Sequence, residues 1–374
     1  MARTVFILGA GASKHAGAPL MNEFLEAARD LLASGNLGAA EEQNFGLVRK
    51  GVNELQLAHS KGDLDIWNLE TVFDAFEMAA LVGCLGDLKG EEVNGLPEAM
   101  REVILTTLQE KIVLPLENRS GSFLAVPTQP YARFVEALVS ARQNAGAYPA
   151  VITFNYDNCL ELALYRGGRT WSYCLDSVTH GDCVKLLKLH GSLNWGFCES
   201  CGTVGESRDW PKIVEDTSIV AARLWQSGER RMHLKVVTGP LGAPQCRCES
   251  SKRSPMLVPP TISKGHYHNI LSKVWAVAAA ELRTAEEIFV CGYSLAETDL
   301  FFRYLYSVGT IGEASLRRFW VFNPDPGVKP RFEALLGKQV LSQPGRFLLF
   351  PSTFDNMNWG TVLRHDLRTL PPPV

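Results

Sequence analysis

The stretch Val5–Ser13, VFILGAGAS, decides the fold of this chain. Val5–Leu8 is an unbroken apolar run of the kind that forms a buried strand, and a turn with two glycines follows at Gly9–Ser13. Apolar residues at helical spacing predict a helix that opens at Pro19. Between a strand and a helix, such glycines let the backbone approach a pyrophosphate, and helix N-terminal amides face the anion. Lys14 replaces the third glycine of the usual pattern, so an ordinary strand-to-helix turn is the alternative.

Strands and helices alternate again after residue 150. The sequence predicts strands at Ala150–Phe154, Val184–Leu189, Glu287–Cys291 and Arg318–Phe322, and helices at Asn158–Tyr165, Asn269–Arg283, Thr298–Ser307 and Pro330–Leu336. This alternation is typical of βαβ units, so we expect an α/β fold with a parallel sheet.

Two segments interrupt this pattern within one domain that spans residues 1–374. Residues 34–145 show helical periodicity at Trp67–Val82, Ala99–Leu116 and Tyr131–Arg142, and they predict a helical insertion. Residues 196–255 are rich in loops and hold two cysteine pairs, which predicts a second, small insertion.

The composition excludes several classes of protein. The chain has 374 residues, of which 46% are hydrophobic and 21% charged, as in an ordinary globular domain. Its net charge of -3 gives no basic footprint for nucleic acid. No apolar run reaches the roughly 18 residues that a membrane span needs, and the first strand begins too early for a signal peptide. Most of the nine cysteines are scattered singly, which favours reduced thiols in a cytoplasmic protein.

Polar side chains follow two of the predicted strands. Asn155 and Asp157 come directly after Ala150–Phe154 and offer an amide and a carboxylate, which can recognise a carboxamide and a ribose hydroxyl. The alternative is an Asx turn with helix capping by Asp157 or Asn158. His190 ends another strand, where a neutral imidazole can act as a general base near pH 7. A histidine that only pins a loop by hydrogen bonds is the alternative there.

Four cysteines have the spacing of a metal site. Cys198 and Cys201 form a C-x-x-C pair followed by Gly202, and Cys246 and Cys248 form a C-x-C pair. Four thiolates suit a structural, tetrahedral Zn²⁺ with no position open for water. The alternative is four reduced surface cysteines.

Together these blocks resemble the motifs of the sirtuin (silent information regulator) family of NAD-consuming enzymes. The matching segments are GAGAS, TFNYD at Thr153–Asp157, LHG at Leu189–Gly191, the cysteine pairs, GYSL at Gly292–Leu295 and Asn323-Pro324. They follow the family's order from residue 5 to about 326. The resemblance implies a Rossmann-like parallel sheet with a small zinc-ribbon-like module, to which this chain adds the helical insertion.

The resemblance also implies roles for single residues. His190 would be the base, Asn155 would contact the nicotinamide ribose and position water, and Asp157 would bind the carboxamide of NAD⁺. The nucleotide-binding residues would be Gly9, Ala10, Gly11, Ser13, Gly292, Ser294, Asp299 and Asn323, and the zinc ligands Cys198, Cys201, Cys246 and Cys248.

Three departures from the protein deacylases of the family indicate a different reaction. The stretch Gly17–Asn22 lacks the deacylases' arginine, prolines in Pro255–Lys264 weaken pairing with a substrate peptide, and the helical insertion is foreign to them. These features, with the GYS…D pattern that ends at Asp299, resemble a bacterial sirtuin-like branch in antiphage defence. That branch hydrolyses NAD⁺ to nicotinamide and ADP-ribose. We therefore expect an NAD⁺ glycohydrolase that acts as the NAD-depleting effector of an abortive-infection system.

Such an effector must be gated, because constant NAD⁺ hydrolysis would kill its host. The resemblance implies control by homo-oligomerisation or by a partner such as a HerA-type ATPase or a short Argonaute-like protein. Two alternatives to NAD⁺ hydrolysis remain. One is an NAD-dependent protein deacylase, and the other is a non-catalytic module that binds NAD⁺ or ADP-ribose. The joint presence of His190, Asn155 and Asp157 argues against the second.

Overall fold

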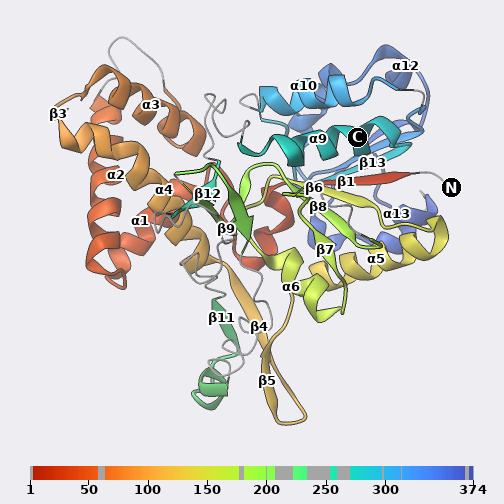
Figure 1. The fold of residues 1–374 in the computed structure, drawn as a ribbon, viewed down its shortest axis with the longest axis horizontal. Helices are drawn as coiled ribbons and strands as arrows, with labels where there is room; N and C mark the ends of the chain where they lie inside the picture. The colour runs from red at the N-terminus through yellow and green to blue at the C-terminus, as the bar shows by residue number, and fades with distance from the viewer. Residues whose placement is uncertain are drawn as a thin grey trace.

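A seven-stranded parallel sheet forms the centre of the molecule (Figure 1). The computed structural model describes residues 3–57, 64–176, 181–198, 200–206, 222–233, 253–258, 270–296, 299–312, 314–366 and 370–373. The sheet has the order β15-β14-β13-β1-β6-β8-β7, and every neighbouring pair is parallel. Its strands are β1 (Thr4–Leu8), β6 (Ala150–Thr153), β7 (Trp171–Ser172), β8 (Val184–Lys188), β13 (Glu287–Cys291), β14 (Arg318–Phe322) and β15 (Phe347–Phe350). The expected α/β fold with a Rossmann-like parallel sheet is confirmed.

The sheet is wound in both directions from its middle. From β1 the chain continues to β6, β7 and β8 on one side, and it returns to β13, β14 and β15 on the other. Strands β1 and β13 are therefore neighbours whose following loops run in opposite directions. In such sheets ligands bind at the carboxyl ends of the strands, where the order reverses.

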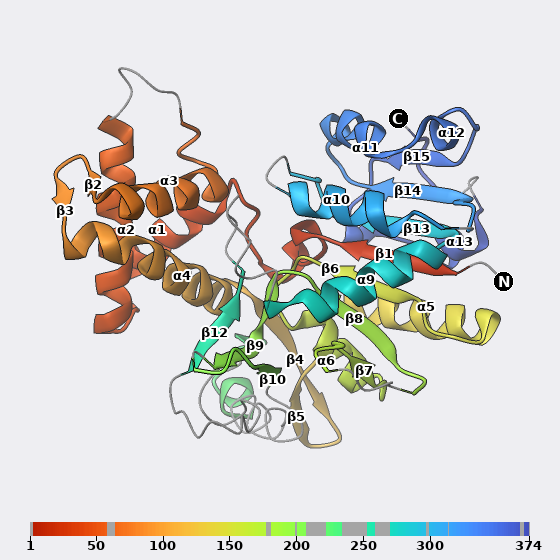
Figure 2. The same ribbon diagram turned by 45° about the horizontal axis from the view of Figure 1, so that its top comes forward.

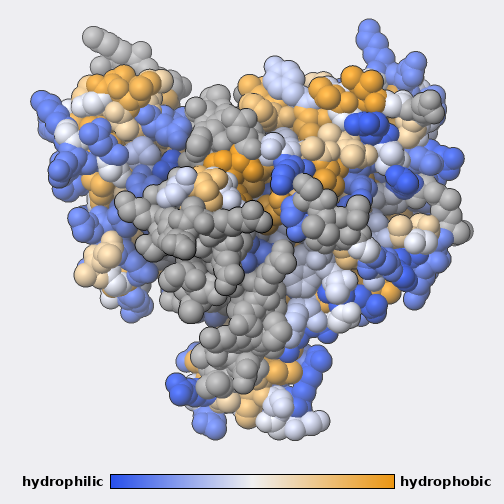
Figure 3. Space-filling view, in the orientation of Figure 1, coloured by the Kyte–Doolittle hydropathy of each residue, from blue (hydrophilic) through white to orange (hydrophobic). Residues whose placement is uncertain are grey.

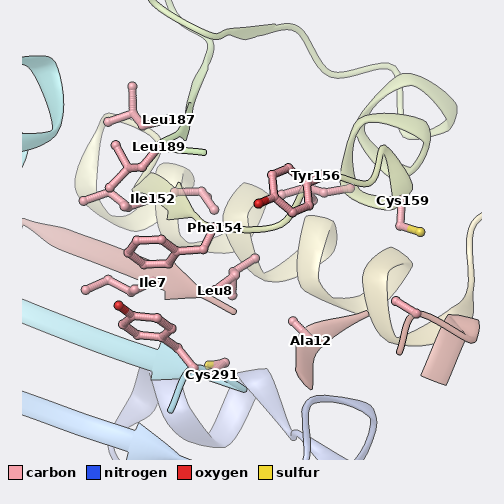
Figure 4. Close-up of a cluster of buried hydrophobic side chains, with 14 of the residues drawn as sticks. Ile7, Leu8, Ala12, Ile152, Phe154, Tyr156, Cys159, Leu187, Leu189 and Cys291 are labelled. Carbon is pink, nitrogen blue, oxygen red and sulfur yellow. The ribbon is translucent and has the colours of Figure 1, made fainter. Parts of the chain in front are cut away.

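Helices cover both faces of the sheet. The pair α9 (Ser272–Thr284) and α10 (Leu300–Gly309) lies on one face, and α5 (Gln129–Ala145), α6 (Cys159–Arg166) and α13 (Trp359–Arg364) lie on the other (Figure 1). Buried side chains from the carboxyl halves of the strands fill the layer between them (Figure 4), among them Ile7, Leu8, Ile152, Leu187 and Cys291. Each fully buried aliphatic side chain contributes about 1.5–3 kcal/mol to folding. The remaining helices beside β15 are α11 (Lys329–Leu335) and α12 (Lys338–Leu341).

Four helices form a lobe beside the sheet (Figure 2). They are α1 (Phe24–Ser34), α2 (Ala39–Leu57), α3 (Leu69–Val82) and α4 (Glu91–Lys111), with the short hairpin β2 (Cys84–Leu85) and β3 (Leu88–Lys89). Helix α5, which the sequence analysis includes in the same insertion, packs on the sheet instead, where Phe134 meets Phe6 and Trp359.

The helix expected at Ala99–Leu116 ends earlier than predicted. Helix α4 stops at Lys111, and β4 (Val113–Arg119) pairs with β5 (Ser122–Ala125) and with β11 (Arg231–His233). Pro115 explains the difference, because its ring removes a helical hydrogen bond and biases the preceding residue toward an extended backbone. Leu114 and Leu116 are buried at alternate positions, as in a strand. The sequence analysis reads them as the end of the apolar helical pattern of the preceding residues.

A second small sheet has the order β10-β9-β12. Its strands are β9 (Gly191–Cys198), β10 (Val204–Glu206) and β12 (Arg253–Leu257), and both pairs are antiparallel. Most of the insertion expected at 196–255 lies outside the described residues. The boundaries at 34–145 and 196–255 therefore stay predictions. In the part of the chain that the structure describes, no helix has the length and apolarity needed to cross a membrane.

Candidate functional site

The predicted site segments come together at the carboxyl edge of the large sheet. Each follows a different strand: Gly9–Ser13 follows β1, Asn155 and Asp157 follow β6, His190 follows β8, Gly292 follows β13 and Asn323 follows β14. Because these strands are consecutive in the order β14-β13-β1-β6-β8, the segments lie along one edge.

The two glycines of the first turn allow a close approach between two loops. A Cβ atom on Gly9 would lie 2.6 Å from the carbonyl oxygen of Gly292, and one on Gly11 would lie 2.8 Å from the Cα of Gly292. The amide of Gly11 also donates to Gly292 O at 2.9 Å. Gly292 itself has φ +63°, a conformation that favours glycine. These glycines therefore bring the loops after β1 and β13 into direct backbone contact.

The helix expected directly after this turn begins later. Two 3₁₀ turns, Ala10–Ala12 and Lys14–Ala16, follow β1, and α1 starts only at Phe24. The amides of Ala12 and Ser13 donate to carbonyl oxygens within the turn. An anion bound at this turn would therefore meet 3₁₀ turns and not the N-terminus of an α-helix. The phosphate contacts predicted for Ala10 and Gly11, which are partly exposed, remain predictions.

Ser13 is the centre of a buried polar cluster. Its hydroxyl donates to Asp157 Oδ2 at 2.6 Å, accepts from Asn155 Nδ2 at 3.1 Å and lies 2.7 Å from the hydroxyl of Tyr131. Burial and then the negative charge of Asp157 hold the pKa of Tyr131 well above its ordinary value, so this hydroxyl stays protonated. Because the single hydroxyl proton of Ser13 goes to Asp157, Tyr131 is the donor to Ser13. The cluster thus fixes Asn155 and Asp157 against the turn after β1. No sequence motif marks Tyr131, which lies on α5, as a member of this cluster.

Asp157 also binds the first residue of helix α6 (Cys159–Arg166). Its Oδ1 accepts from the amide of Cys159 at 3.0 Å, which is the Asx-turn role given as the alternative for this residue. Both carboxylate oxygens thus have a partner, and the thiol of Cys159 also donates a hydrogen bond to this carboxylate. Asn155 is 9% exposed and Asp157 6%, so any group that they bind must enter the sheet edge.

His190 lies beside a carboxylate. Its ring packs edge-on against Phe154, with centroids 5.0 Å apart, and Nε2 is 3.7 Å from Asp299 Oδ1. The other carboxylate oxygen of Asp299 accepts from the Tyr293 hydroxyl at 2.8 Å. The backbone of His190 is fixed through its carbonyl oxygen, which accepts from Val258 N at 2.8 Å. The resemblance predicts a nucleotide contact for Asp299, whereas its carboxylate lies beside the imidazole of His190.

The remaining predicted nucleotide residues form the loops after β13 and β14. Asn323 is buried, donates to Tyr293 O at 3.3 Å and accepts from Asp325 N at 2.9 Å. Ser294 is exposed, and its carbonyl oxygen accepts from Arg331 at 3.3 Å. The next residue, Leu295, is buried with φ +50°, which costs a non-glycine residue about 1–2 kcal/mol. Strain of this kind gathers at functional loops, where surrounding packing maintains it.

A buried ion pair connects the two segments that carry the candidate catalytic residues. Lys188, at the end of β8, donates to Glu161 Oε1 at 2.8 Å and to the carbonyl oxygens of Asp157 and Tyr156. The side chains of Lys188 and Glu161 are each 1% exposed. Lys188 therefore fixes the loop that holds Asn155 and Asp157 to the strand that ends at His190. No sequence motif predicts this pair. Its only trace in the sequence is one charged residue, Glu161 or Lys188, within each of two apolar runs.

The cysteine pairs are described only in part. Cys198 is buried at the end of β9, Cys201 is exposed, and Gly202 behind them has φ +71°. The amide of Gly202 donates to Cys198 O at 2.9 Å, a tight turn that suits a zinc knuckle. Cys246 and Cys248 lie outside the described residues. Among the residues that are described, no three histidine, cysteine or carboxylate side chains are grouped to hold a metal ion.

A cavity among the described residues lies at the opposite, amino edge of the sheet. It has a volume of about 860 Å³, and charged side chains line it, including Arg3, Lys185, Glu287, Arg318 and His365. None of the predicted site residues lines this cavity, so we do not assign it to the substrate.

Comparison with known proteins gives matches among solved structures. A structure titled for the mechanism and regulation of Sir2 enzymes matches at 15% identity and a TM-score of 0.38, covering 94% of this chain and 88% of the other. A Sir2 homologue in complex with NAD matches at 16% identity and 0.37, covering 97% and 88%. Sir2 bound to an acetylated peptide matches at 14% identity and 0.38, covering 98% and 92%.

These proteins belong to the family that the sequence motifs resemble. No protein-family model and no curated protein matches the chain. At such identities and TM-scores, the structural matches assign neither a substrate nor a reaction to this chain.

Proposed function

We propose that this chain is an NAD⁺ glycohydrolase, which cleaves NAD⁺ to nicotinamide and ADP-ribose and depletes the cell of NAD⁺ as a defence effector. The observation that carries the proposal is the pairing of His190 with Asp299 at the sheet edge that also holds Asn155 and Asp157. A buried imidazole beside a carboxylate is the arrangement of a general base.

The reaction needs little beyond positioning and charge. The bond between ribose C1′ and the nicotinamide nitrogen breaks, and its electron pair leaves with neutral nicotinamide. Water then adds to C1′ of the oxocarbenium-like ribose, and its proton passes to His190. The amide of Asn155 and the carboxylate of Asp157 supply donors and acceptors for a ribose hydroxyl and the carboxamide. Fixed polar groups in a buried site stabilise such a transition state without reorganising.

One structural observation favours the deacylase alternative. Strand β12 is at the edge of the three-stranded sheet β10-β9-β12, since among the described strands it pairs only with β9. An edge strand can accept an extended peptide. Pro255 within β12 removes one donor from such a ladder, which is why we place NAD⁺ hydrolysis first.

Nicotinamide release from NAD⁺ by the purified chain tests the proposal. We expect release without any peptide, and we expect His190→Ala to lower kcat at least about 100-fold because the general base is lost. His233→Ala, an exposed histidine on β11, is the matched control and should leave the rate unchanged. Release that requires an acetylated peptide would instead establish a deacylase. Binding of NAD⁺ without release under any oligomeric state would favour the binding module.

Structural zinc is part of this proposal. Strand β12 begins at Arg253, which pairs with Cys198 of the first cysteine pair. The second pair, Cys246 and Cys248, precedes Arg253 by only a few residues along the chain. We expect one Zn²⁺ per chain by elemental analysis, and we expect Cys198→Ser to lose it and to lower the melting temperature. Cys84→Ser, at an exposed cysteine far along the chain, is the control. A metal-free wild type with an unchanged melting temperature in chelator would contradict the zinc module.

Gating by association is also part of the proposal. Large apolar side chains are exposed on α3 and α10, where Figure 3 shows orange surface, and they include Met78, Leu81, Leu300 and Val308. Such residues support a homo-oligomer, which light scattering of the purified chain would detect. Association with a HerA-type ATPase or a short Argonaute-like protein stays a prediction from the resemblance, as does the cytoplasmic location.

A further inference from the structure

We infer that Asp299 is a positioning residue for His190, forming with Tyr293 a carboxylate–imidazole pair that strengthens the histidine as a base. This inference rests on the proposed function for its catalytic part. It reassigns Asp299, because the sequence pattern GYS…D placed this residue among the nucleotide contacts.

The geometry of the pair supports the reassignment. The 3.7 Å between His190 Nε2 and Asp299 Oδ1 is too long for a hydrogen bond and within the range of an ion pair. Both side chains are almost fully buried, 9% and 6% exposed, so little water screens the interaction. A carboxylate at this distance stabilises the imidazolium that forms when His190 accepts a proton, and it does so for either ring nitrogen because the charge is shared over the ring.

Tyr293 holds the carboxylate in place. Its hydroxyl donates to Asp299 Oδ2 at 2.8 Å, and its ring stacks on Phe154 at a centroid distance of 4.3 Å and meets Phe302 edge-on at 5.7 Å. Burial first, and then the charge of Asp299, keeps the pKa of Tyr293 well above its ordinary value. The tyrosine therefore remains a donor, and the Asp299 carboxylate keeps one fixed oxygen and directs the other to the imidazole.

Other titratable groups surround the pair. Tyr156 packs near the imidazole with a centroid distance of 6.3 Å, and Glu70 of α3 and Arg303 of α10 act electrostatically on Tyr293. Asp299 differs from these groups because its carboxylate lies within ion-pair distance of His190. Its removal should therefore change the titration of His190 more than the removal of either Glu70 or Arg303.

The test combines a titration that needs no activity with kinetics. NMR of isotope-labelled histidine in wild type and Asp299→Asn, with the His190 signal assigned from His190→Gln, should show that His190 loses its proton at a pH lower by about one unit or more in the variant. Nicotinamide release should fall about 10- to 100-fold in kcat, while KM and the Kd of NAD⁺ stay within threefold. Tyr293→Phe keeps the ring stack and should give a smaller change in the same direction.

The outcomes separate the inference from the proposed function. If the chain does not hydrolyse NAD⁺ but His190 titrates at lower pH in Asp299→Asn, the proposed function fails and the pair is established. An unchanged titration, or a raised Kd with unchanged kcat, overturns the inference and returns Asp299 to the nucleotide contacts. Asp182→Asn, at an exposed carboxylate at the opposite edge of the sheet, is the matched control. Should Asp299→Asn not fold, the titration of His190 in Tyr293→Phe decides.

Discussion

Replacement of Lys188 by methionine is expected to lower the free energy of unfolding by about 3–5 kcal/mol, because it leaves the buried carboxylate of Glu161 without its cation. Glu161 would keep two neutral donors, the Tyr173 hydroxyl and the Asn158 amide, each 3.0 Å away. The carbonyl oxygens of Asp157 and Tyr156 would lose a charged donor as well. Chemical denaturation of Lys188→Met measures the loss.

A double variant separates the charge from the packing. In Lys188→Met with Glu161→Leu neither charge is buried, so the part of the loss that comes from the unpaired carboxylate should return. The part that comes from the carbonyl oxygens of Asp157 and Tyr156, which still lack their donor, should remain. Lys185→Met on the same strand is the control, since its pair with Glu281 is half exposed and contributes about 0–1 kcal/mol. A loss below about 1 kcal/mol in Lys188→Met would mean that the ion pair does not fix the two segments.

The same variants connect stability to function. Because Lys188 holds the loop of Asn155 and Asp157 to the strand of His190, the double variant should fold while its site is less well fixed. Lys188→Arg keeps the positive charge but would not reproduce the native contacts. A guanidinium is larger than an ammonium, and this buried position is closely packed.

The sequence predicted five of the seven strands of the large sheet, because these are apolar runs that end at glycine or at a polar residue. The short strand β7 and the edge strand β15 were not predicted. The burial of β1 and β13 on both faces produces such runs, and both strands occur where they were expected. Helix boundaries were predicted less well. Local spacing extended α4 into residues that Pro115 turns into a strand, and it opened α1 several residues before Phe24.

The sequence predicted which residues lie at the site but not the side chains that contact them. His190, Asn155 and Asp157 lie at one sheet edge, as strand ends require, but their contacts come from residues far away in the sequence. Tyr131 is 118 residues from Ser13, and Glu161 is 27 from Lys188. A tyrosine on an amphipathic helix and a lysine in a strand have no local signature of such roles, because the partners meet only after the sheet has formed.

Replacement of Gly292 by alanine is expected to destabilise the chain by about 2–5 kcal/mol, from two causes that add. Its φ of +63° costs an alanine about 1–2 kcal/mol. The new Cβ would lie 2.5 Å from Ala12 N and 2.6 Å from Gly11 C, both backbone atoms, so the loops after β1 and β13 must separate, at about 1–3 kcal/mol. Thermal or chemical unfolding measures the sum.

Gly168→Ala isolates the first cause. Gly168 has φ +64°, and beyond its chain neighbours no atom of the described residues lies within 4 Å of the position that a Cβ would take. Its substitution should therefore cost only the roughly 1–2 kcal/mol of the backbone conformation. Equal losses in the two variants would show that the contact between Gly292 and the first turn is easily relaxed. A much larger loss for Gly292→Ala, together with a weakened affinity for NAD⁺, would show that this backbone contact keeps the glycine turn in the shape that a nucleotide needs.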